Sequence, residues 1–234
     1  MGVAESARRQ CQAGNGDGVT FTIIDADQRS EEWRLARCGR LTGSRASDVL
    51  ATIKSGEAAA RRDYKMQLVV ERLTGRPQDS TFTNEAMEWG VNVEPMARSA
   101  YEVRTGNVAT QTGFLAHTSL MVGCSVDGSI DNFTGILELK CPKSATHYRY
   151  LREGTMPADH RPQVLHNLWV TGAQWCDFLS FDPRFPDGMR TMMVRVERDQ
   201  RAIDEYAAKA IAFLEEVERD VSAALGWRVL AASA

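Results

Sequence analysis

Apolar residues recur every three or four positions in several long stretches of the chain, which predicts amphipathic helices. The clearest stretch is 82–105, where apolar side chains fall at 86, 89, 93, 96, 100 and 103. Pro95 interrupts this pattern, so the helix should kink or restart there. A shorter helix should begin after Ser30, which can act as its N-cap. The remaining helices are predicted at 45–51, 58–73, 144–152, 160–171 and 200–225.

Short runs of apolar and β-branched residues lie between these helices and predict strands. They cover 21–24, 108–115, 120–126, 133–141, 174–181 and 189–196. Asp127-Gly128 and Asp131-Asn132 supply turn residues, so 120–126 and 133–141 should be two strands joined by a polar turn. The order of elements predicts an α/β or α+β fold in one domain, with a central mixed sheet flanked by helices. Residues 1–19 are rich in Gly, Ala and polar residues, and we expect them to be a loose tail.

The strand at 133–141 carries the candidate chemistry. Side chains alternate faces along a strand, so Glu138 and Lys140 share one face, while Leu139 shares the other with its apolar neighbours. Asp127 lies at the end of the preceding strand. Two carboxylates and the carbonyl of Leu139 suit a hard cation such as Mg²⁺, and a lysine beside the ion can orient or deprotonate a water molecule. Glu-x-Lys also occurs by chance, so a surface hairpin with a Glu/Lys pair is the alternative.

Composition and charge narrow the class of protein. The 234 residues are 43% hydrophobic and 25% charged, enough for a sizeable core. The five cysteines are scattered and form no CxxC motif, which fits a reducing cytoplasm. No apolar run approaches the roughly 20 residues of a membrane span, so we expect a soluble, intracellular protein. The net charge of −3 leaves two interpretations open, scattered solvated charge or a basic DNA-binding face on an acidic protein.

Three polar residues surround the start of the short helix at 45–51. A helix N-terminus presents free N–H groups that favour anions. Arg37, Thr42 and Ser44 lie near this end, where Thr42 or Ser44 could equally be an ordinary cap. Glu94 is ambiguous in the same way, because it stands at the edge of an apolar stripe beside Pro95. Such a carboxylate is either solvated or held in a site.

Several blocks together resemble the phage lambda exonuclease and YqaJ-type viral recombinase family of PD-(D/E)xK nucleases. They occur in the family's order with compatible spacing, from about residue 28 to the last helix. The blocks are Trp33…Arg37-Cys38-Gly39-Arg40-Leu41-Thr42-Gly43-Ser44, Trp89-Gly90…Glu94…Ala97-Arg98, Ser125-Val126-Asp127-Gly128, Glu138-Leu139-Lys140-Cys141-Pro142, Gln163…Trp169-Val170 and Phe181-Asp182-Pro183-Arg184. Val126 replaces the proline of the pattern, and Pro95 directly after Glu94 departs from it and leaves the placement of Glu94 open.

The resemblance implies a role for each matching residue. The metal ligands would be Asp127, Glu138, the Leu139 carbonyl and Glu94, which completes a two-metal site. Lys140 resembles the catalytic lysine, and Gln163 the glutamine that places the lysine or the attacking water. The residues that resemble those holding the terminal 5′-phosphate of the cut strand are Arg37, Thr42, Ser44 and Ser125.

The resemblance also implies a biological setting. The family digests one strand of duplex DNA 5′→3′ from an end, uses Mg²⁺ (with Mn²⁺ as a substitute), often forms a ring-shaped homotrimer and works with a single-strand annealing protein. Residues 20–234 would be the exonuclease domain of a phage or prophage protein in the cytoplasm of a bacterial host. A restriction-like or structure-specific endonuclease on the same core and a catalytically inactive DNA-binding module are the alternatives. Closed circular DNA separates an endonuclease from an exonuclease, because an exonuclease leaves it intact. The intact Asp127, Glu138 and Lys140 argue against an inactive DNA-binding module.

Overall fold

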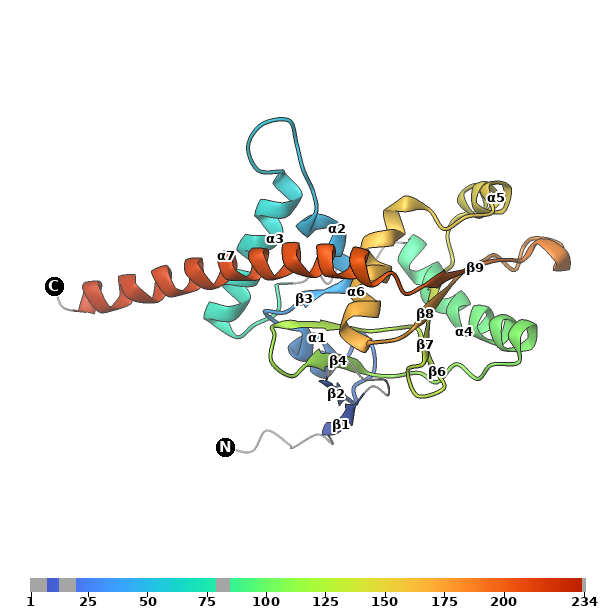
Figure 1. Cartoon of the computed structure of the whole chain (residues 1–234), viewed down its shortest axis with the longest axis horizontal. Coiled ribbons are helices and arrows are strands. Elements are labelled where there is room, and N and C mark those ends of the chain that lie inside the picture. Colours follow the sequence, from blue (N-terminus) through green and yellow to red (C-terminus); the bar gives the residue numbers. More distant parts are fainter. Residues whose placement is uncertain (1–7, 13–19, 79–84, 233–234) are drawn as a thin grey trace.

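A computed structural model describes residues 8–12, 20–78 and 85–232. Within these ranges the chain forms two mixed β-sheets flanked by seven α-helices (Figure 1). The α+β fold expected from the sequence is therefore confirmed, although the strands divide into two sheets instead of one central sheet. None of the helices in these ranges is long and apolar enough to cross a membrane.

The first sheet has the strand order β1-β2-β4-β5-β3. Only the β3–β5 pair is parallel. Its strands are β1 (Arg8–Gln12), β2 (Thr20–Ile24), β3 (Leu41–Thr42), β4 (Phe114–His117) and β5 (Val122–Cys124). Strand β1 lies in the segment expected to be loose, where it pairs antiparallel with β2. The expected strand at 108–115 is shorter and later, since β4 begins at Phe114 and Thr110 makes only an isolated bridge to Ser129.

The second sheet has the order β6-β7-β8-β9 and carries the candidate catalytic strand. Its strands are β6 (Gly128–Ile130), β7 (Gly135–Lys140), β8 (Trp175–Phe181) and β9 (Thr191–Glu197). The prediction that 120–126 pairs with 133–141 was wrong. The strand that forms a hairpin with β7 is β6, which lies inside the expected turn. The chain reverses between them at Asp131–Phe133. Those three residues all have positive φ, so the left-handed turn expected at Asp131-Asn132 occurs there, but it joins β7 to β6 and not to the strand expected at 120–126.

The helices are α1 (Glu31–Arg37), α2 (Ala46–Val49), α3 (Ala59–Thr74), α4 (Glu85–Thr105), α5 (Ser144–Glu153), α6 (Arg161–Thr171) and α7 (Gln200–Ala232). Short 3₁₀ turns add η1 (Gly43–Arg45), η2 (Ala158–His160) and η3 (Asp187–Met189). Ser30 caps α1 as expected, since its side chain accepts a hydrogen bond from the Trp33 N–H. Helix α4 runs through Pro95 as one helix.

The other expected caps differ from the structure. Neither Thr42 nor Ser44 caps η1 or α2 with its hydroxyl. Ser144 is the first residue of α5 and not its N-cap, which is Lys143. The Ser144 hydroxyl hydrogen-bonds the Asp182 carboxylate instead. Burial raises the pKa of Asp182, but hydrogen bonds from Arg184 and Ser144 outweigh it and hold the pKa low.

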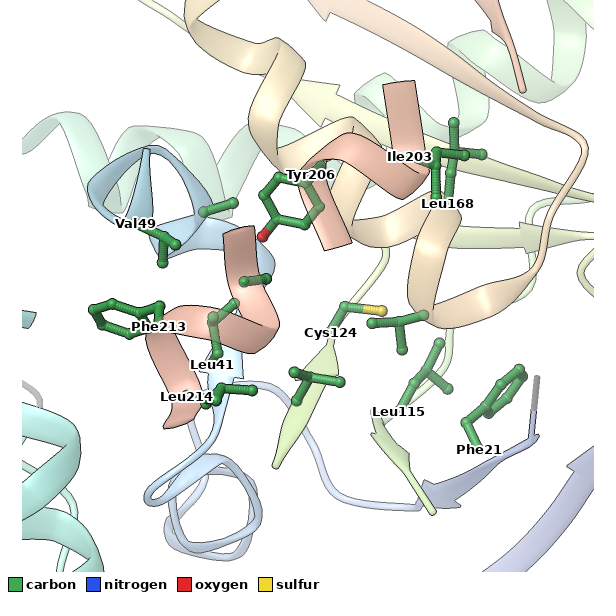
Figure 2. Packing of buried hydrophobic residues seen from close by; sticks show 14 of the residues in the cluster. Phe21, Leu41, Val49, Leu115, Cys124, Leu168, Ile203, Tyr206, Phe213 and Leu214 are labelled. Carbon is green, nitrogen blue, oxygen red and sulfur yellow. The ribbon is translucent and has the colours of Figure 1, made fainter. Parts of the chain in front are cut away.

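Two apolar clusters hold the two sheets in place. The larger one joins the first sheet to α3, α6 and α7, and Figure 2 shows Leu41, Leu115 and Cys124 packed beneath Ile203 and Phe213. The smaller one joins α4 to the second sheet through Val93, Ala97 and Tyr101. Leu137 and Leu139 belong to the smaller cluster, whereas Ile136 belongs to the larger. Strand β7 therefore lies between α4 on one face and α6 on the other, which leaves Glu138 and Lys140 on the α6 side.

Candidate active site

Strand β7 holds a carboxylate and an ammonium group side by side. Glu138 and Lys140 are two residues apart on one face, and their Oε1 and Nζ atoms are 2.6 Å apart. The Glu138 side chain is 3% exposed and that of Lys140 is 27% exposed, so the carboxylate is buried and the lysine is partly open to solvent. Burial lowers the pKa of Lys140, but the carboxylates of Glu138 and Asp127 outweigh it and raise the pKa above its ordinary value. Lys140 is therefore a charged hydrogen-bond donor in this state, not a free base.

Asp127 lies between the two sheets and is joined to β7. Its N–H donates to the Leu137 carbonyl at 3.1 Å, and its Oδ2 accepts from the Leu139 N–H at 2.6 Å. Burial, together with the negative charges of Glu138 and Glu94, raises the pKa of Asp127 to about 8. Three carboxylates thus lie within electrostatic reach of one another, and a cation would relieve their repulsion.

Glu94, on α4, is connected to this site through an arginine. Arg98, one turn along the helix, donates from Nη2 to Glu94 Oε1 at 2.8 Å and from Nη1 to the Asp127 carbonyl oxygen. Glu94 is therefore neither a solvated surface group nor in direct contact with the other two acids. Arg98 belongs to a block that the sequence analysis identified without giving it a role. Its i, i+4 spacing from Glu94 was the available signal.

Helix α6 supplies two amide side chains to the opposite side of the site. The Lys140 ammonium donates to Gln163 Oε1 at 3.2 Å. Asn167, one turn further along α6, donates from Nδ2 to Glu138 Oε2 at 3.1 Å. The sequence analysis placed Gln163 in the site but not Asn167, although the two share a helix face.

The donor set fits a hard divalent cation. Asp127, just before β6, and Glu138, on β7, offer carboxylate oxygens, which is the ligand type that Mg²⁺ prefers. Within the described residues, no group of three or more His, Cys, Asp or Glu side chains is arranged to hold a metal ion. The Glu94 carboxylate is paired with Arg98, whose Nη2 lies 2.8 Å from Oε1. Glu94 would have to exchange this partner for a metal ion.

A second polar cluster lies on α1 and the turn after β3. Arg37 Nη2 is 3.5 Å from Ser44 Oγ, which is 3.4 Å from Thr42 Oγ1. The Arg37 guanidinium also lies over the Trp33 ring, 4.0 Å from its centroid. Trp33 Nε1 donates to Ser125 Oγ at 2.8 Å. We call these five residues the Trp33 cluster: Trp33, Arg37, Thr42, Ser44 and Ser125.

The Trp33 cluster borders the acidic site directly, since Ser125 precedes Asp127 by two residues. The structure therefore brings together the four residues that the resemblance assigned to a phosphate, and connects them to the carboxylates. Sequence reasoning did not give Trp33 a role, although it heads the block that contains Arg37.

Comparisons with known proteins identify the family of this chain. Residues 32–174 match the model of the YqaJ-like viral recombinase domain. The chain belongs to this family. The match includes every predicted site residue from Arg37 to Gln163, so the family assignment and the two clusters concern the same part of the chain.

Solved structures of related exonucleases support the assignment of this chain to the YqaJ-like family. An alkaline exonuclease, LHK-Exo from Laribacter hongkongensis, is 36% identical, with a TM-score of 0.76 over 88% of this chain and 100% of that chain. LHK-Exo in complex with dAMP gives the same identity and coverage with a TM-score of 0.78. A phage-related exonuclease from Haemophilus somnus 129PT is 14% identical with a TM-score of 0.58, covering 78% of this chain and 95% of that chain, and shows the fold alone. No curated protein matches the chain.

Family membership and the likeness to an alkaline exonuclease support a DNA exonuclease, which is a hydrolase of phosphodiester bonds. The PD-(D/E)xK nuclease resemblance drawn from the sequence is thereby confirmed at the level of family and enzyme class. The roles of individual residues stay predictions.

Proposed function

We propose that this protein is a Mg²⁺-dependent exonuclease that digests one strand of duplex DNA 5′→3′ from a 5′-phosphorylated end. The main observation behind the proposal is that the Trp33 cluster and the carboxylate site meet at Ser125. Ser125 is bonded to Trp33 on one side and leads into Asp127 on the other. A phosphate held by the Trp33 cluster would therefore lie beside the carboxylates that hold the metal.

Asp127, Glu138, the Leu139 carbonyl and Glu94 would hold two Mg²⁺ ions, with Mn²⁺ as a substitute. Bound metal ions would lower the pKa of an attacking water and stabilise the leaving oxygen. Lys140 carries a charge, so its role is to orient the water and to stabilise the developing negative charge on the phosphate. Gln163 holds Lys140 from the α6 side through the 3.2 Å hydrogen bond.

The end preference follows from charge. A terminal phosphate carries more negative charge than an internal diester, and a guanidinium offers a fork of donors that matches its oxygens. Arg37, with the hydroxyls of Thr42, Ser44 and Ser125, supplies this set of donors. The dAMP in the LHK-Exo complex is a mononucleotide, the kind of product that stepwise digestion releases.

The family resemblance extends the proposal to partners. We propose a homotrimeric ring around duplex DNA, which would let a chain with a net charge of −3 stay on its substrate. The 3′ single strand left behind would pass to a single-strand annealing protein during phage-type recombination in a bacterial cytoplasm. Light scattering tests the ring, and a monomer at working concentration would contradict it.

Linear duplexes labelled separately at the 5′ and 3′ ends test the central proposal. We expect loss of the 5′ label first, only with Mg²⁺ or Mn²⁺, and faster with a 5′-phosphate than with a 5′-hydroxyl. Arg37→Ala should erase most of this preference without weakening metal binding. Closed circular plasmid should stay intact. Its cleavage would favour the endonuclease, and equal rates at both end chemistries would remove the phosphate pocket and weaken the 5′→3′ assignment.

A further inference from the structure

Asn167, on α6, hydrogen-bonds the Glu138 carboxylate. It is 1% exposed, and its Nδ2 donates to Glu138 Oε2 at 3.1 Å. Since Lys140 holds Oε1, the two oxygens of Glu138 each have a separate donor. Loss of Asn167 would leave one oxygen of a buried carboxylate without this donor, which is costly in a low-dielectric site.

The other end of the Asn167 amide has an unusual environment. Its Oδ1 is buried and has no hydrogen-bond partner in the described structure. Reversing the amide would turn Oδ1 toward the Glu138 carboxylate, where two acceptors would repel each other, so the orientation is determined by chemistry. The unpartnered acceptor is therefore a consequence of holding Glu138.

Oδ1 lies against Gly43, the first residue of η1. A Cβ placed on Gly43 would be only 2.3 Å from Asn167 Oδ1. Gly43 is buried between Thr42 and Ser44, whose hydroxyls belong to the Trp33 cluster. Gly43 therefore allows the turn to approach the amide, and the amide fills the space between this turn and Glu138.

We propose that Asn167 is a positioning residue that couples the 5′-phosphate pocket to the metal-binding carboxylate Glu138. Its donor end sets the orientation of Glu138, and its acceptor end sets the position of the Thr42–Ser44 turn. Both halves of the site then keep one spacing, which decides where the terminal phosphate lies relative to the metal ions. The inference rests on the proposed function, because it concerns the same two clusters.

The alternative is that Asn167 only fills space in α6, and a matched control tests it. Thr171 lies one turn along the same helix, is fully buried, and donates from Oγ1 to the Asn167 carbonyl at 2.6 Å. Thr171→Val removes a buried hydrogen bond from α6 without touching either cluster. It should lower the melting temperature and leave metal affinity and end preference unchanged.

Asn167→Ala should change both properties. We expect Mn²⁺ affinity, measured by calorimetry on the DNA-free protein, to fall about tenfold, as is typical for the partners of metal ligands. The rate ratio for 5′-phosphate over 5′-hydroxyl duplex should fall in parallel. Asn167→Ser, whose hydroxyl can bond back to the helix, serves if the alanine variant does not fold.

A double-mutant cycle with Gly43→Ala tests the contact itself. Gly43→Ala alone should be severely impaired, because the new methyl group meets Oδ1. In the Asn167→Ala background that atom is gone, and the nearest remaining contact is His166 Cδ2 at 3.3 Å. The methyl group is then nearly tolerated, so the second substitution should add little to the first.

The outcomes separate the two claims. The coupling alone is overturned if the wild type binds Mn²⁺ and prefers the 5′-phosphate, but Asn167→Ala behaves like Thr171→Val. Additive effects in the double-mutant cycle would overturn it equally. Wild-type protein without metal binding and without end preference overturns the proposed function, and the coupling with it.

Discussion

The indole Nε1 of Trp33 donates a 2.8 Å hydrogen bond to the hydroxyl of Ser125, 92 residues further along the chain. The same indole ring supports the Arg37 guanidinium at 4.0 Å from its centroid. One aromatic side chain thus contacts both Arg37, the arginine of the proposed phosphate pocket, and the residue that leads into Asp127.

Trp33→Phe should weaken the end preference without abolishing cleavage. Phenylalanine keeps an aromatic ring under Arg37 but lacks the N–H that holds Ser125. Loss of one such hydrogen bond costs about 1 kcal/mol, so the 5′-phosphate preference should fall roughly fivefold. Initial rates on both end chemistries measure it. Trp169→Phe, in the larger apolar cluster, is the control, and an unchanged ratio in Trp33→Phe would contradict the role of the hydrogen bond.

Arg98→Ala should impair metal binding and cleavage together. Arg98 hydrogen-bonds both Glu94 and the Asp127 carbonyl, so its loss leaves both proposed metal ligands without the partner that orients them, and we expect this loss of orientation to outweigh the release of Glu94 from the ion pair. We expect cleavage to fall about tenfold or more, as for other partners of metal ligands, with Arg98→Lys intermediate because lysine lacks the fork of donors. Calorimetry and rate measurements test both effects. Arg104→Ala, on the same helix and bonded to Thr191 Oγ1, should retain both properties.

Lys140→Ala should lose cleavage and keep metal binding, because the ammonium acts on the water and the phosphate and not on the ion. Lys140→Arg should also be weak, since the larger guanidinium does not reproduce a compact charge. Titration of each variant with Mg²⁺ or Mn²⁺ decides the point. Metal binding that disappears with activity would make Lys140 a structural residue.

Asp127→Asn should abolish cleavage without unfolding the protein. The amide oxygen can still accept the Leu139 N–H, and the substitution replaces a buried carboxyl group, whose ionisation burial and Glu138 disfavour, by a neutral amide. Thermal stability without metal should therefore be unchanged or slightly higher. Melting curves and nuclease assays test this together. Appreciable Mg²⁺-dependent activity in the variant would exclude Asp127 from the metal site.

His166 should make the folded protein sensitive to mild acid. Its Nε2 donates to the Gly123 carbonyl at 2.9 Å, and its Nδ1 is hydrogen-bonded to the Tyr206 hydroxyl at 2.8 Å, so the whole ring is enclosed in the fold. Burial lowers its pKa from 6.5 to about 4, so the unfolded chain takes up a proton first and the free energy of unfolding falls as the pH drops from 6.5 toward 4.

The full effect is on the order of 3 kcal/mol. Urea unfolding at several pH values should show this loss in the wild type and a flatter profile in His166→Gln. His117→Gln, at a half-buried position, is the comparison. Parallel profiles for wild type and His166→Gln would show that other groups control the acid response.

Local chemistry determined much of the site in advance. Alternation along one strand was enough to place Glu138 and Lys140 on the same face, because side-chain direction in a strand depends only on position. Ser30 was identifiable as the cap of α1 because capping involves only neighbouring residues. The left-handed turn at Asp131-Asn132 was equally readable, since these residue types tolerate positive φ. The order of the elements indicated the fold class, and the resemblance of several sequence blocks to a known family indicated the family and the enzyme class.

The pairing of strands was not determined locally. Val122–Cys124 and Gly128–Ile130 both precede β7, and only packing decided that the second pairs with it while the first joins the other sheet. Hydrogen bonding between strands depends on which apolar faces meet, and those faces come from α4, α6 and α7. For this reason a polar, glycine-containing segment became a strand.

The connections between clusters likewise exist only in the folded chain. Trp33 and Ser125, Asn167 and Glu138, and Arg98 and Asp127 are far apart in sequence, and no residue type or spacing identifies them as partners. Each pair is formed because helices α1, α4 and α6 pack around the ends of β5 and β7. The sequence by itself determined which side chains carry the chemistry. The tertiary structure decided which of them hold the others in position, because side chains this far apart along the chain meet only when the elements that carry them pack together.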